Sequence, residues 1–154
     1  MKSGLLALCF AVGATSTAAA ATPEWVDISG VRSGERLAFD LSSLTIDGSK
    51  RTAWVKSRFP PRSFTTGSTP IVQILALELF DCGRRTVQLT QEIDSDATGA
   101  TVKVFNLVDN PIPPYGVAPG TIDQATLDAV CAAPNKNRFP LLDEIRTLID
   151  RVLH

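Results

Sequence analysis

Residues 71–93 read IVQILALELF-DCGRR-TVQLTQEI, and they hold the strongest structural signal of the chain. Ile71 to Phe80 is the longest apolar strand candidate, and Asp81-Cys82-Gly83 after it is typical of a turn. From Thr86 to Ile93 apolar and polar residues alternate, as in a half-buried strand. This alternation predicts one face with Val87, Leu89 and Ile93, and an opposite face with Thr86, Gln88, Thr90 and Glu92. Two strands joined by so short a turn are antiparallel.

Further alternating segments flank this hairpin. We expect strands at 25–28, 36–41, 51–59 and 101–108, with a tight turn at Asp47-Gly48. Residues 60–70, with three prolines and Gly67, predict a loop, and residues 111–120, rich in Pro and Gly, predict no regular element. Short connections exclude parallel neighbours, which need long crossovers. The pattern therefore predicts an α+β fold whose sheet is an antiparallel meander of about six strands.

The helical signals come late in the chain. Thr121-Ile-Asp-Gln124 matches a capping box, which predicts a helix from there to about Ala132, before Pro134. Its apolar residues would face the sheet, and Asp123 and Asp128 would face solvent. The residues expected on the sheet side are Ile122, Leu127, Val130 and Cys131.

A second helix is expected from Pro140, a favourable first helical residue. Its apolar residues recur at spacings of three and four and form a broad stripe. They are Leu141, Leu142, Ile145, Leu148, Ile149, Val152 and Leu153. The stripe either packs on the domain's own sheet or mediates a contact with a partner, including a second copy in a homodimer. Membrane adsorption is less favoured, because the polar face carries charges of both signs.

The first 21 residues have the layout of a secretory signal peptide. Lys2 precedes a short apolar run, Leu5 to Val12, and Ala19 and Ala21 form an A-x-A site before Thr22. We therefore divide the chain into a signal peptide (1–21), one domain (22–133) and a helical extension (134–154). The minority alternative is a lipoprotein anchored through Cys9, but Cys9 lies inside the apolar run.

Cleavage after Ala21 removes Lys2 and leaves 14 basic and 16 acidic residues, a net charge of −2. This balance does not favour nucleic acid as a partner, which requires clustered Lys and Arg. No later segment approaches the roughly 18–20 apolar residues of a transmembrane helix. We expect an exported protein of the periplasm or the cell surface.

The two cysteines after the leader, Cys82 and Cys131, are expected to form a disulfide, because exported compartments are oxidising. The alternative is a pair of buried free thiols. A zinc site is disfavoured, because two cysteines do not complete a tetrahedral site and His154 is the one histidine of the chain.

No residue pattern indicates catalysis or a cofactor. Residues 94–99 resemble the start of a calcium loop, but Phe105 stands where the twelfth-position glutamate is needed, so a hairpin turn is favoured. Arg84-Arg85 could bind a carboxylate or phosphate of a partner, although a solvated or salt-bridged strand edge is the more common role of such a pair. A nucleophile would lack a base, since His154 is terminal. We therefore expect a protein that is not an enzyme and holds no metal.

The order of several short motifs resembles the surface-adhesin protein E family. After Trp25 come Phe39-Asp-Leu-Ser-Ser-Leu44, Leu79-Phe-Asp-Cys-Gly-Arg-Arg85, Val117-Ala-Pro-Gly-Thr121 and Val130-Cys131. The resemblance covers residues 25–131 and implies an antiparallel sheet with a helix fastened by a Cys82–Cys131 bond. It also implies a non-catalytic, adhesin-like protein that binds host or extracellular proteins, the namesake being an outer-membrane adhesin for host matrix and serum proteins. The alternative function is a periplasmic inhibitor or envelope assembly factor.

Overall fold

The computed structural model describes residues 22–28, 35–60 and 64–134. The predicted signal peptide and the predicted helix from Pro140 lie outside the described residues, so both remain predictions. Among the described residues, no helix is long and apolar enough to cross a membrane.

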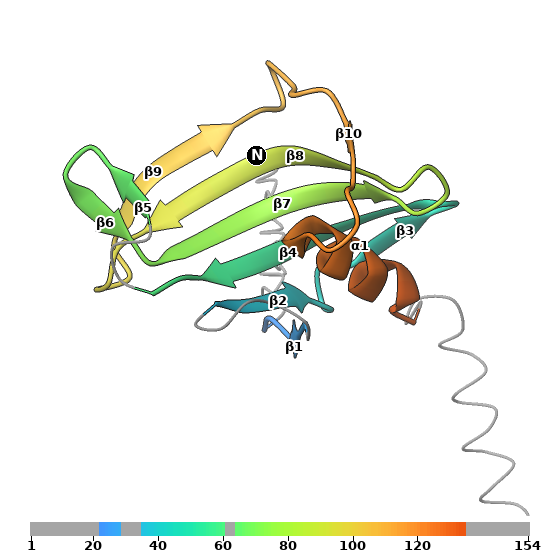
Figure 1. The fold of residues 1–154 in the computed structure, drawn as a ribbon, viewed down its shortest axis with the longest axis horizontal. Coiled ribbons are helices and arrows are strands. Elements are labelled where there is room, and N and C mark those ends of the chain that lie inside the picture. Colours follow the sequence, from blue (N-terminus) through green and yellow to red (C-terminus); the bar gives the residue numbers. More distant parts are fainter. Residues whose placement is uncertain (1–21, 29–34, 61–63, 135–154) are drawn as a thin grey trace, which may run out of the picture.

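The described residues form an antiparallel sheet of eight strands with one helix on it (Figure 1). The sheet order is β1-β2-β4-β7-β8-β10, with β3 also paired to β4 and β9 also paired to β8. A separate two-stranded sheet is made of β5 and β6. The elements are β1 (Trp25–Asp27), β2 (Arg36–Asp40), β3 (Thr45–Asp47), β4 (Lys50–Arg58), β5 (Phe64–Thr66), β6 (Thr69–Ile71), β7 (Gln73–Asp81), β8 (Thr86–Ser95), β9 (Thr101–Asn106), β10 (Tyr115–Gly116) and α1 (Ile122–Ala132).

The predicted α+β class and antiparallel pairing are confirmed, but about six strands was too few. Residues 60–70 are not all loop, because β5 and β6 form a hairpin around Gly67, whose φ of +61° suits a tight turn. Pro70 is tolerated in β6 because this ribbon has only two strands and therefore an unpaired side. Residues 111–120 also contain a short strand, β10, which pairs with Thr86 and Val87. β3, before the correctly predicted turn at Gly48, was missed as well.

A β-bulge in β8 overturns the predicted alternation of that strand. Leu77 pairs with Gln91 and Glu78 with Leu89, so Thr90 is an extra residue, and its hydroxyl donates a hydrogen bond to the Leu77 carbonyl at 2.7 Å. Beyond the bulge the two faces exchange. Ile93 pairs with Leu75 and lies opposite to Val87, while Glu92 joins the Val87 face; both placements differ from the expectation.

The core lies between α1 and one face of the sheet, here called the helix face. Its centre is formed by the side chains with the lowest exposure, at most 1%: Ala53, Phe80, Val87, Leu127 and Val130. As predicted, Ile122 and Cys131 also pack against this cluster and Asp128 is exposed. Asp123, expected in solvent, is instead partly buried.

The opposite face, here called the open face, carries a row of apolar side chains. Strand alternation and register place Trp54, Leu75, Leu77, Leu79 and Ile93 there, on three neighbouring strands. All five are partly exposed. Within the described part of the chain, the one helix packs on the other side of the sheet (Figure 1).

Candidate binding surfaces and the disulfide hairpin

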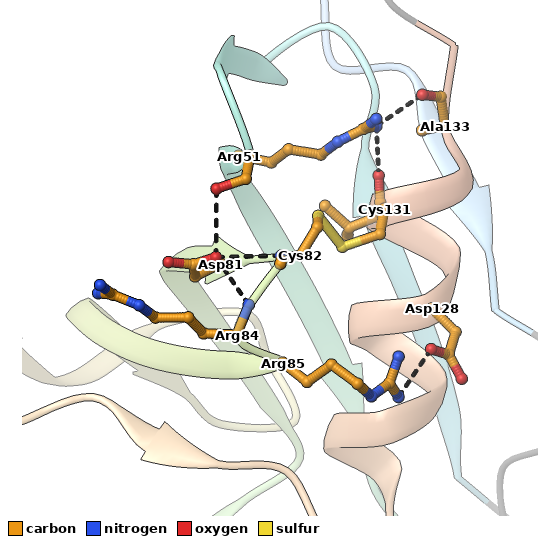
Figure 2. Close-up of a disulfide and its surroundings, with 11 residues drawn as sticks. Arg51, Asp81, Cys82, Arg84, Arg85, Asp128, Cys131 and Ala133 are labelled. Carbon is orange, nitrogen blue, oxygen red and sulfur yellow. Dashed lines mark hydrogen bonds and ion pairs between the residues drawn. A yellow bond between two sulfur atoms is a disulfide. The ribbon is translucent and has the colours of Figure 1, made fainter.

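The hairpin between β7 and β8 is covalently joined to the last turn of α1. Figure 2 shows the disulfide between Cys82 and Cys131. Their Cα atoms are 5.8 Å apart. The predicted pairing is thereby confirmed, and the alternative of two free thiols is wrong. The bond holds the helix over the end of the sheet where Phe80 and Val87 are buried.

Asp81 organises the turn that carries Cys82. One of its carboxylate oxygens accepts hydrogen bonds from the backbone amides of Gly83 and Arg84, both at 3.0 Å, and from the Ser49 hydroxyl at 3.3 Å (Figure 2). The Arg84 amide is the largest cause that lowers the pKa of Asp81, because these bonds favour the charged carboxylate. The ionised Asp81 thus fixes the backbone that positions both Cys82 and the two arginines.

Arg51 joins β4 to the end of α1. Its guanidinium donates hydrogen bonds to the carbonyls of Val130, at 2.7 Å, and Ala133, at 2.6 Å (Figure 2). The last turn of α1 contains no basic residue of its own, so Arg51 supplies the positive charge that a helix C-terminus favours. Sequence reasoning missed this role. The available signal was an arginine that alternates with Ala53 and Val55 and so points to the core side of β4.

The two arginines proposed as partner contacts have different surroundings. Arg85 reaches towards α1 and forms an ion pair with Asp128 at 3.0 Å, with both side chains about half exposed. Arg84 is exposed, and its side chain points away from the helix (Figure 2). The salt-bridged alternative therefore describes Arg85. Binding of a partner by Arg84 stays a prediction.

Acidic side chains gather on the helix face near the start of α1. The Tyr115 hydroxyl hydrogen-bonds to Asp123, and burial followed by the charge of Asp123 raises the pKa of Tyr115. Burial, followed by the charges of Asp123 and Glu92, raises the pKa of Glu78 to about 8. Glu78 is therefore mainly protonated at neutral pH. Among the described residues, no three metal-binding side chains are grouped to hold an ion.

The segment that resembles a calcium loop is a hairpin turn between β8 and β9. One carboxylate oxygen of Asp96 accepts bonds from the Thr98 amide and hydroxyl, at 2.8 and 2.7 Å, and from the Ala100 amide at 3.1 Å. The Thr98 hydroxyl is the largest cause that lowers the pKa of Asp96. Gly99 has a φ of +85°, as this turn requires. The favoured interpretation as a turn is confirmed.

Exposed apolar side chains lie along the segment from β9 to β10, which is here called the edge patch. Register pairs Val104 with Ile93 and Tyr115 with Val87, so these two side chains lie on opposite faces of the sheet. In the described residues, the large apolar side chains classed as exposed all lie in this segment. They are Val104 (53% exposed), Val108 (71%), Ile112 (45%) and Tyr115 (41%). β9 pairs with β8 alone among the described strands, so its outer backbone edge is unpaired within them. Open edges of this kind accept an added strand.

A depression of about 430 Å³ lies where β4, β7 and the β8–β9 turn meet. Its lining is largely polar and includes Arg58, Gln73, Asp96 and Thr98. The Arg58 side chain donates a hydrogen bond to Gln73 at 3.0 Å. In the same lining the Thr98 hydroxyl donates a hydrogen bond to Asp96 at 2.7 Å, as part of the β8–β9 turn.

The family model and the described strands and helix cover nearly the same residues. The model of surface-adhesin protein E covers residues 25–132. The chain belongs to the surface-adhesin protein E family. No curated protein and no solved structure matches the chain.

The residues that match the family model include both cysteines of the disulfide. The match begins at β1, contains the whole edge patch and ends at the last residue of α1. The resemblance inferred from the short motifs is thus confirmed. The match does not extend to residues 133–154, where the sequence predicts the second helix.

Proposed function

We propose that this protein is a non-catalytic, exported, adhesin-like binding protein whose ligand is a host or extracellular protein. Membership of the surface-adhesin protein E family supports the adhesin-like role. The edge patch supports a contact at this edge, because exposed apolar side chains follow β9, whose outer edge is unpaired among the described strands. The predicted signal peptide supports export.

The contact that fits the edge patch is an added strand. β9 offers backbone donors and acceptors to an extended segment of the ligand, and this pairing supplies affinity without regard to side chains. Val104 then selects apolar side chains on one face of the added strand. On the other face Lys103 lies over the ring of Phe105, with its Nζ 4.1 Å from the ring centroid, and places a positive charge beside an apolar surface. An extended segment with apolar and acidic residues suits this combination.

Arg84 is a second candidate contact. Its side chain is exposed and its guanidinium is suited to a carboxylate. Arg85 is the weaker candidate, because it already pairs with Asp128.

The edge patch can be tested with substitutions that do not touch the core. Val108→Asp and Ile112→Asp place charges on exposed positions and are expected to weaken binding to an array of immobilised extracellular-matrix proteins by about tenfold each. Thr45→Asp, on the exposed β3 far along the sheet order, is the matched control and should bind like the unaltered chain. Surface plasmon resonance measures the affinities, with Arg84→Ala in the same series. Equal affinities for the unaltered chain, Val108→Asp and Ile112→Asp would rule out the edge patch as the contact.

The same array separates the adhesin-like role from the alternative, a periplasmic inhibitor or envelope assembly factor. A chain that retains no matrix protein at micromolar concentration would favour the alternative. The apolar residues of the C-terminal segment also predict a homodimer. Sedimentation of the free protein measures whether this dimer forms.

A further inference from the structure

We propose that the C-terminal segment 140–153 docks with its apolar stripe on the open face of the sheet of its own chain, so that the sheet is covered on both sides. The open face is the row Trp54, Leu75, Leu77, Leu79 and Ile93. The segment carries seven apolar residues at helical spacing and lies outside the described residues.

The first argument is that the open face needs a cover. A sheet in a small domain usually exposes a polar face when it faces water, with apolar residues confined to the core side. Here Leu75, Leu77 and Leu79 follow one another on β7, and Trp54 and Ile93 flank them on β4 and β8. The bulge at Thr90 is what adds Ile93 to this row. A contiguous apolar surface of this kind marks a contact.

The second argument is that the helix face does not suit the tail. One end of that face is occupied by α1, over Phe80 and Val87. Register places Glu78, Glu92 and Asp94 on the remainder, with Asp94 near Thr66 of the β5–β6 hairpin at 3.4 Å. Burying carboxyl groups under an apolar helix is unfavourable. Of the two faces of the sheet, the open face is therefore the one that matches the apolar stripe.

The third argument is reach. Arg51 and the disulfide hold the end of α1 at the last pair of the β4–β7 ladder, Lys50 with Asp81. The chain after Ala133 has to pass around this end of the sheet to reach the open face. The axes of two helices on opposite faces of a sheet are about 20 Å apart, because each helix is about 10 Å in diameter. Seven residue steps lead from Ala133 to Pro140 and span at most about 25 Å. The tail then starts next to Leu79, and its stripe of about 18 Å covers the row towards Leu75.

Trp54 is a built-in reporter for this contact. In a Trp25→Phe background, Trp54 is the one tryptophan of the chain. The protein is expressed with its own leader and purified as the exported, disulfide-bonded full chain. Ile145→Asp and Leu148→Asp place charges in the stripe, and each is expected to shift Trp54 emission to longer wavelength and to raise its quenching by acrylamide. Thr147→Asp adds the same charge on the polar side of the predicted helix and should leave both signals unchanged.

A reciprocal variant checks the same contact from the sheet. Leu77→Asp on the open face is expected to speed tryptic cleavage after Arg146 to the rate found for Ile145→Asp, while circular dichroism reports whether the sheet is intact. If Ile145→Asp and Leu148→Asp leave Trp54 unchanged in the intact fold, the tail does not cover the open face and the proposal is wrong.

Two further outcomes would also overturn it. Protection of Trp54 that disappears on dilution, together with a dimer in sedimentation, would assign the open face to the tail of a second copy. Binding of the unaltered chain to vesicles of phosphatidylcholine and phosphatidylglycerol through the tail, with Trp54 unprotected in their absence, would assign the stripe to a lipid surface. None of these measurements depends on the edge patch, so this inference and the proposed function fail separately.

Discussion

Arg51 shows how one side chain of the sheet completes an element that is distant in sequence. The carbonyls of Val130 and Ala133 at the end of α1 lack a basic neighbour on the helix, and the Arg51 guanidinium supplies two charge-assisted hydrogen bonds. These bonds and the disulfide act on the same helical turn. The end of α1 is thus held to the sheet by both a covalent and a polar contact.

Replacing Arg51 by Met tests the polar contact. Met keeps an apolar stem of similar length and removes the donors, so we expect the free energy of unfolding to fall by about 2 kcal/mol. Urea unfolding of the exported chain measures this loss. Lys50→Met, at the exposed neighbouring position, is the control and should unfold as the unaltered chain does. An unchanged midpoint for Arg51→Met would show that the disulfide alone holds the helix end.

Glu78 predicts a pH dependence of stability. Its pKa is raised from 4.5 to about 8 in the folded chain, first by burial and then by Asp123 and Glu92. Between these values the folded state keeps a proton that the unfolded state has lost, so the free energy of unfolding decreases as pH rises, by at most about 1.4 kcal/mol per pH unit. Above about pH 8 this contribution no longer changes.

Urea unfolding in a series of buffers across this window measures the slope. Glu78→Gln keeps the shape of the side chain and cannot ionise, so its stability should vary less with pH in that window. A slope identical in the two proteins would mean that Glu78 ionises in the folded state as it does in the unfolded state. Asp109→Asn, at an exposed position after β9, is the control for a general effect of lost charge.

At the scale of elements, α1 is held at both ends by different means. At its start Thr121 accepts a hydrogen bond from the Gln124 amide at 3.2 Å, as the capping box predicted. The Gln124 side chain reaches back to the Gly120 amide, at 2.6 Å, one residue before the position that a standard box uses. At its end the helix is held by Cys131 and Arg51.

The disulfide can be removed to test its part in docking α1. Cys82→Ser with Cys131→Ser is expected to lower the free energy of unfolding by about 4 kcal/mol, because a loop of 49 residues in the unfolded chain is released. Hydrogen exchange should accelerate in α1 more than in β4 and β7, since the strands keep their ladder. The unaltered chain after chemical reduction is the matched comparison and should behave alike. Unchanged protection of α1 in both samples would contradict this account.

At the scale of the whole molecule, the described residues form a sheet with α1 on one side (Figure 1). Register places the acidic side chains on that same side and the apolar row on the other. The edges of the sheet differ as well. The β1 edge is formed by a strand of three residues, while β9, with six residues, offers the longer edge left unpaired by the described strands and begins the edge patch. Short edge strands resist pairing with other chains, so the asymmetry favours one edge for ligands.

Surface display is the prediction that belongs to this scale. If the chain acts as an adhesin, proteinase K added to intact cells should remove it, because the edge patch has to face the medium. A periplasmic marker protein that stays intact is the control for leakage. Survival of the chain until the outer membrane is opened would place it in the periplasm and favour the inhibitor or assembly role.

The sequence alone predicted the elements that depend on local order. The hairpin of β7 and β8, the helix after Thr121 and its end before Pro134 follow from alternation, capping and the restricted backbone of proline. The Cys82–Cys131 disulfide could be predicted because two cysteines of a small exported domain usually form a disulfide in an oxidising compartment. The motifs in their order also indicated the family.

Only the tertiary structure decided which residues share a face. The bulge at Thr90 depends on how β8 pairs with β7 near Leu77. The sequence of β8 alone does not predict this bulge. The roles of Arg51 and Glu78 likewise arise where segments far apart in the chain meet. Local order determines which elements form, whereas register and burial, which depend on distant partners, determine what each side chain contacts.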